Sequence, residues 1–128
     1  MVKNIKHTTV VLGSLSLLII LFNCRQPVIP TEEDLAGYGW TLYETGEYQE
    51  AREWFYDAVD KDSSYADGYN GIGWCFGKLR QADSAAVYFH VSQTKPFDPY
   101  DTPDLDLDLY AGLTFSYSGM HIDSLVST

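Results

Sequence analysis

Apolar and small residues recur along this chain at the spacing of helices that bury one face. Between residues 32 and 65 they lie three and four positions apart, first in one stripe and then, after a turn at Gly46, in a second. The two stripes consist of Leu35, Tyr38, Gly39 and Leu42, and of Tyr48, Ala51, Phe55, Ala58 and Val59. Glu50, Arg52 and Glu53 occupy the opposite face of the second stripe, where we expect them to meet water. The pattern predicts two antiparallel helices packed against each other.

The same pattern returns 34 residues later along the chain. The sequence Gly-Tyr-Gly-Trp at residues 37–40 recurs as Gly-Ile-Gly-Trp at residues 71–74, and Phe55 recurs as Phe89. A third start is visible at residues 110–117, which match the second unit at an offset of 41. A fixed period of this length indicates a repeat architecture, in which each unit buries its apolar face against the next.

A 34-residue period of helix pairs with these small and aromatic positions resembles the tetratricopeptide-repeat (TPR) family. The resemblance implies an all-α fold, an α-solenoid of antiparallel TPR helix hairpins with about two and a half repeats. The repeats would span residues 32–65, 66–99 and 107–128, the last one incomplete. Asp123 and Ser124 align with the start of a second helix, so we expect the chain to turn before them and to end early in that helix.

The first 23 residues, 1–23, have the features of an export signal. Lys3 and Lys6 precede an apolar run at residues 10–22, which is shorter than the roughly 20 residues that a membrane-spanning helix needs. The run leads into Leu21-Phe22-Asn23-Cys24, which resembles the lipobox of bacterial lipoproteins, although a lipobox usually has a small residue in place of Asn23.

The lipobox resemblance implies that Cys24 is lipidated and anchors the chain in a membrane of the bacterial cell envelope. Two or more acyl chains give stable anchoring. Arg25 follows the cysteine, which points to the outer membrane and to a domain that faces the periplasm. Residues 24–31 contain two prolines and are expected to form an extended tether. Two alternatives remain open, an uncleaved N-terminal anchor and an ordinary cleaved signal that leaves Cys24 free.

The composition and charge of the chain indicate which classes of partner it could bind. The chain has 128 residues, enough for one domain, and its 45% hydrophobic content can supply a core. It carries 8 Lys and Arg residues against 18 Asp and Glu residues, for a net charge of -10. An acidic surface repels phosphate backbones, so we expect no nucleic-acid partner. It favours a protein or peptide partner with an apolar or basic segment.

The TPR resemblance further implies a concave groove lined by one stripe of each first helix. In this sequence that stripe places a ladder of aromatic residues above small residues, with acidic residues along one edge. The candidate groove residues are Trp40, Trp74, Phe115, Gly37, Gly71, Gly112, Asn70, Glu33 and Asp67, with Asp108 on the same acidic edge. The structural alternative is that the aromatic residues pack between repeats and bind nothing.

Catalytic and metal-binding patterns are missing from the sequence. His90 and His121 lie in no recognised nucleophile motif, and Cys75 stands alone in an apolar helix, where a cysteine usually acts as a small hydrophobic residue. The alternating Asp-Leu run at residues 104–108 lacks the glycine and glutamate of a calcium loop. We therefore expect no enzymatic activity, no metal and no cofactor.

These observations predict a non-enzymatic, lipid-anchored scaffold that binds protein segments. The alternative is a structural or assembly subunit whose incomplete third repeat docks on another copy or on a partner. A small hydrolase is a remote third possibility. The sequence leaves the oligomeric state open.

Overall fold

The structure is a computed structural model that describes residues 27–98 and 103–126. This part of the chain is all-helical and contains no strand, so the all-α expectation is confirmed. The predicted signal at residues 1–23 and the lipidation site at Cys24 lie outside the described residues. The helices are α2 (Glu32–Thr45), α3 (Tyr48–Lys61), α4 (Ala66–Lys78), α5 (Ala82–Gln93) and α6 (Leu105–Val126).

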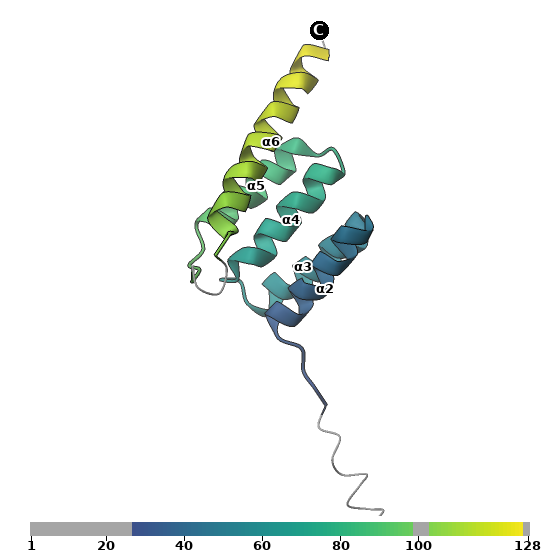
Figure 1. Cartoon of the computed structure of the whole chain (residues 1–128), viewed down its shortest axis with the longest axis vertical. Helices are drawn as coiled ribbons and strands as arrows, with labels where there is room; N and C mark the ends of the chain where they lie inside the picture. Colours follow the sequence, from purple (N-terminus) through teal and green to yellow (C-terminus); the bar gives the residue numbers. More distant parts are fainter. Residues whose placement is uncertain (1–26, 99–102, 127–128) are drawn as a thin grey trace, which may run out of the picture.

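The helices are arranged in two layers (Figure 1). Each helix packs against the next one along the chain, and α4 also contacts α2 and α6. As a result α2, α4 and α6 form one layer, while α3 and α5 lie behind it (Figure 1). The last part of α6 extends beyond the neighbouring helices (Figure 1). None of the helices in the described ranges has the length and hydropathy needed to cross a bilayer.

Local signals set the helix ends. Thr31 accepts a hydrogen bond from the Asp34 amide at 3.1 Å, and the Asp34 carboxylate accepts one from the Thr31 amide at 2.9 Å, a reciprocal cap that starts α2. Gly46 ends α2 in the left-handed conformation at φ 90°, which a glycine adopts without steric cost. Arg80 takes a similar conformation at φ 61° between α4 and α5, where the first helix pair has its glycine.

Two phenylalanine rings form the centre of the packing. Phe55 on α3 and Phe89 on α5 are both fully buried. A Cβ atom added at Gly71 would lie 2.4 Å from the Phe55 ring, and one added at Gly39 would lie 3.0 Å from it. The Phe55 ring therefore leaves no room for a side chain at Gly71 and packs tightly against Gly39. The second ring has the same arrangement, with Gly73 on α4 and Gly112 on α6 as its neighbours.

The third helix pair does not form in the described residues. α6 continues without interruption to Val126, so the turn expected before Asp123 is wrong. No described residue of α6 has a positive φ, unlike Gly46 at the end of α2. Gly119 has a helical backbone within α6 and lies close to α5, where an added Cβ would be 3.3 Å from the Ala82 Cβ.

Most of the alternating Asp-Leu run at residues 104–108 belongs to α6. α6 already begins at Leu105, and the side chains of Leu105 and Leu109 are buried against α5 and its surroundings. Leu107, which lies between these two leucines in the sequence, points to solvent instead and is 69% exposed. Arg52 was expected to face water on α3. Its guanidinium carbon instead lies 4.9 Å from the centroid of the Phe76 ring on α4.

The first prediction concerns the glycines beneath Phe55. We expect Gly71→Ala to lower the free energy of unfolding by about 1–3 kcal/mol, because the buried ring must shift to make room for the added methyl group. Gly37→Ala is the matched control on α2, since an added Cβ there meets nothing within 4 Å. It should raise the free energy of unfolding by up to about 1 kcal/mol through helix propensity. Urea unfolding of both variants checks this, and equal effects would contradict the packing.

Candidate interaction surface

The layer of α2, α4 and α6 brings the predicted aromatic residues next to one another. Trp40 on α2 and Trp74 on α4 border the same hollow, which has a volume of about 260 Å³ and is also lined by Tyr43 and Asp108. On α6, Phe115 follows Trp74, with 6.5 Å between the ring centroids. The three rings thus form a row across the layer, in the order of the helices that carry them.

Each aromatic residue in this row is partly packed and partly open to solvent. The Trp40 ring lies edge-to-face against Phe55 at 4.9 Å, and Trp74 has the same relation to Phe89 at 5.5 Å. Both indoles nevertheless remain partly exposed, and Phe115 is 52% exposed. The row therefore supports the helix packing from one side and offers apolar surface on the other.

Trp40 and Asp67 connect α2 to α4. The Trp40 indole N–H donates a hydrogen bond to Asp67 Oδ2 at 2.8 Å. The Asn70 side-chain amide donates to the other Asp67 oxygen at 3.3 Å. This bridge restrains the indole of Trp40, which lines the hollow beside Trp74.

Three of the predicted groove residues are not on the surface. Asn70 is fully buried, and its Oδ1 atom has no hydrogen-bond partner among the described residues. Gly71 and Gly112 are buried beneath Phe55 and Phe89, so they cannot touch a bound segment directly. These three residues therefore lie within the packing of the helices and not at the surface of the layer. Only Gly37 among the three predicted glycines is exposed with open space above it.

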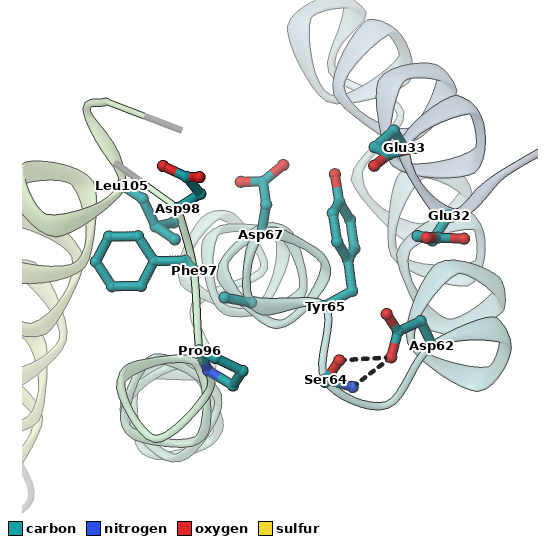
Figure 2. Close-up of a pocket in the computed structure, with 11 residues that line it drawn as sticks. Glu32, Glu33, Asp62, Ser64, Tyr65, Asp67, Pro96, Phe97, Asp98 and Leu105 are labelled. Atoms are coloured by element: carbon teal, nitrogen blue, oxygen red, sulfur yellow. Dashed lines mark hydrogen bonds between the residues drawn. The ribbon is translucent and has the colours of Figure 1, made fainter. Parts of the chain in front are cut away.

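An acidic pocket lies at the N-terminal ends of α2 and α4 (Figure 2). Its volume is about 460 Å³, and the described residues that line it include no basic side chain. Figure 2 shows the Tyr65 ring standing between Asp67 on one side and Glu33 on the other. The side chains of Phe97 and Leu105 form an apolar wall of the pocket on the other side of Asp67 (Figure 2). The carboxylates around the pocket belong to Glu32, Glu33, Asp62, Asp67 and Asp98.

Hydrogen bonding and burial act differently on the acidic groups here. Hydrogen bonds from the Ser64 hydroxyl and amide hold the pKa of Asp62 below its usual value. Burial raises the pKa of Asp108, and the charges of Asp67 and Asp104 raise it further, while a hydrogen bond from the Asn70 side chain acts in the opposite direction. Asp108 therefore lies in a locally negative environment beside the two indoles.

The described residues contain no cluster suited to binding a metal ion. Within them no group of three or more His, Cys, Asp or Glu side chains could hold a metal ion. Cys75 is buried, and burial raises the pKa of its thiol to about 12, so it is inert as a nucleophile at neutral pH. His90 is exposed and its Nε2 atom lies 2.7 Å from the Tyr117 hydroxyl, which ties α5 to α6.

Sequence reasoning missed Tyr43, which lines the hollow together with the two indoles. Tyr43 lies three residues after Trp40, a spacing that places two side chains on the same side of a helix. Extending the predicted aromatic stripe by one turn along α2 would have found it. Comparison of the chain with protein-family models, with curated proteins and with solved structures gives no match.

The second prediction concerns the Trp40–Asp67 bridge. In a double-mutant cycle we expect Trp40→Phe and Asp67→Asn to be coupled by about 1 kcal/mol, because each variant removes one part of a charge-assisted hydrogen bond. Urea unfolding of the single and double variants measures the coupling. The control pairs Trp40→Phe with Glu33→Gln, an exposed acid of the same pocket, and should be additive. Additivity in both cycles would show that the bridge contributes nothing to stability.

Proposed function

We propose that this chain is a helical adaptor that binds a segment of a partner protein along the layer formed by α2, α4 and α6. Its membrane attachment would come from acyl chains on Cys24. The adaptor would belong to the bacterial cell envelope, most naturally to the outer membrane on its periplasmic side. It would perform no chemistry itself, and its role would be to hold the partner near the membrane.

The repeat period supports a TPR-type arrangement. α4 follows α2 by the same 34 positions that separate α5 from α3, and each pair of consecutive helices packs together. Phe55 and Phe89 occupy equivalent places in two successive pairs, each between glycines of two neighbouring helices. These features favour a stacked series of helix hairpins, in which the first helices form one continuous face.

The single observation that carries the binding proposal is the partly exposed row of Trp40, Trp74 and Phe115. Aromatic residues that are half-packed and half-open are typical of the residues that dominate protein interfaces. Acidic groups border the row at Asp67 and Asp108. A segment with apolar side chains and positive charge would therefore be complementary to this face.

A second candidate function is assembly through α6. Exposed large apolar side chains gather on this helix, and its last part extends beyond α4 and α5 (Figure 1). A further hollow of about 390 Å³ opens there between Gly77 on α4 and Ile122 on α6. A second copy or another helical protein could pack on this side. The exposed side chains are those of Leu107, Tyr110, Phe115, Tyr117 and Ile122.

The third prediction tests the adaptor function by photocrosslinking. A photoreactive phenylalanine analogue at Phe115, in the source organism, should give an adduct with a different protein. The same analogue at Val87 is the matched control, because Val87 is 58% exposed but lies on α5 in the other layer. Trp74→Ala should reduce the Phe115 adduct severalfold with the helical circular dichroism spectrum retained.

Three results of that experiment would decide against the adaptor. They are no adduct at either position, equal adducts at both, or an adduct only of twice the chain mass. The last result would favour the assembly function instead.

The fourth prediction concerns the anchor. Cys24→Ser should move the protein from the membrane fraction to the soluble fraction, because the acyl chains provide the binding energy for the bilayer. Cys75→Ser is the matched control, since it changes the other cysteine of the chain and should leave the protein in the membrane fraction. Retention of the Cys24→Ser variant in the membrane would rule out lipidation as the anchor and would favour an uncleaved N-terminal segment.

A further inference from the structure

The hollow between α2 and α4 has the composition of a cation-binding site. Its lining residues are three aromatic side chains, Trp40, Tyr43 and Trp74, and one carboxylate, Asp108. We call these four residues the aromatic cage. The face of an aromatic ring carries negative charge density and attracts cations, most strongly for tryptophan. A carboxylate at the rim adds a full negative charge to the same space.

The structure already contains an ammonium group over one of these rings. Lys78 Nζ lies 5.8 Å from the centroid of the Tyr43 ring, although Lys78 does not line the hollow. This contact lies outside the hollow, and it places one positive charge near the aromatic cage. Asp67, which holds the Trp40 indole, and Asp104, which acts electrostatically on Asp108, make the surroundings more negative.

The size of the hollow indicates what kind of cation it takes. Pockets for whole small molecules have volumes of roughly 300–1,000 Å³. At about 260 Å³ the aromatic cage is smaller than this range. It therefore suits the head group of one side chain rather than a complete metabolite. That side chain would belong to the segment that follows the aromatic row.

The ring geometry favours lysine over arginine. The planes of Trp40 and Tyr43 lie at 80° to each other, with 5.5 Å between their centroids. A planar guanidinium can stack on only one of two perpendicular rings, whereas a compact ammonium can approach both. Asp108 can then pair with the same ammonium, because it lines the same hollow.

We propose that the aromatic cage binds the ammonium group of a lysine side chain carried by the partner segment. This inference rests on the proposed adaptor function and names the side chain that anchors the segment. The aliphatic stem of the lysine would lie along Trp74 towards Phe115, and its charge would be held by Asp108. The acidic composition of the chain would then assist the approach of a basic segment.

The test is a nuclear magnetic resonance titration that follows the indole N–H signals of the three tryptophans. The probe is N-acetyl-lysine amide, with N-acetyl-norleucine amide as the uncharged analogue of the same stem. We expect the lysine compound to shift the Trp40 and Trp74 signals in a saturable way. Trp54 serves as an internal reference, because it packs against Tyr38 and does not line the hollow.

Two variants of equal charge separate a specific site from general acidity. Asp108→Asn should weaken lysine binding about fivefold or more, as expected for the loss of a close ion pair and its share of the cage. Asp106→Asn removes the same charge from an exposed position of α6 that does not line the hollow, and should leave binding unchanged. N-acetyl-arginine amide should bind more weakly than the lysine compound.

The proposal is overturned if norleucine amide shifts the indole signals as much as lysine amide does. It is equally overturned if the two asparagine variants weaken binding alike, or if arginine amide binds as tightly as lysine amide. This titration needs no partner protein. Its failure alongside a persistent Phe115 adduct would remove the lysine anchor and leave the adaptor function intact.

Discussion

The fold depends on the close approach of two phenylalanine rings to glycine backbones. Phe55 and Phe89 are fully buried, and each lies between glycines of two neighbouring helices. Glycine costs about 1 kcal/mol of helix propensity relative to alanine at such positions. Packing must offset this cost, because a methyl group at Gly71 or Gly112 would overlap the ring that covers it. The rings thus fix the distance between α2, α4 and α6.

This spacing explains why the interaction surface lies where it does. With the first helices brought close by the buried rings, the residues next to those glycines meet across the helix boundaries. Trp40 reaches Asp67 on α4, and Trp74 reaches Phe115 on α6. Trp40 and Trp74 also line one hollow together with Tyr43 and Asp108. Trp40 and Trp74 therefore take part both in the packing of the core and in the candidate site.

The sequence predicted the helices well because their signals are local. The repeat bounds and the turn at Gly46 agree with the starts of α2, α3 and α4 at Glu32, Tyr48 and Ala66, and the buried Phe55 belongs to a predicted apolar stripe. The end of α6 was predicted wrongly, since the helix continues through Gly119 to Val126, whereas the first unit turns at Gly46. A repeat alignment transfers a turn from one unit to the next, even where the later unit has no residue in the left-handed conformation among those described.

The site was predicted less completely because it depends on neighbouring helices. Helical spacing assigns a residue to a face of its own helix, and in the structure Trp74 lies beside both Trp40 and Phe115. It could not tell that Gly71 and Gly112 would be covered by rings from other helices.

The central claim is that the buried rings hold the first helices in one layer. The most direct measurement is the set of nuclear Overhauser effects between the ring protons of Phe55 and Phe89 and the α-protons of the glycines. We expect strong effects from Phe55 to Gly71 and from Phe89 to Gly112, which connect successive helix pairs. Effects confined to Gly39 and Gly73, which lie within each pair, would contradict the shared layer and with it the continuous aromatic row.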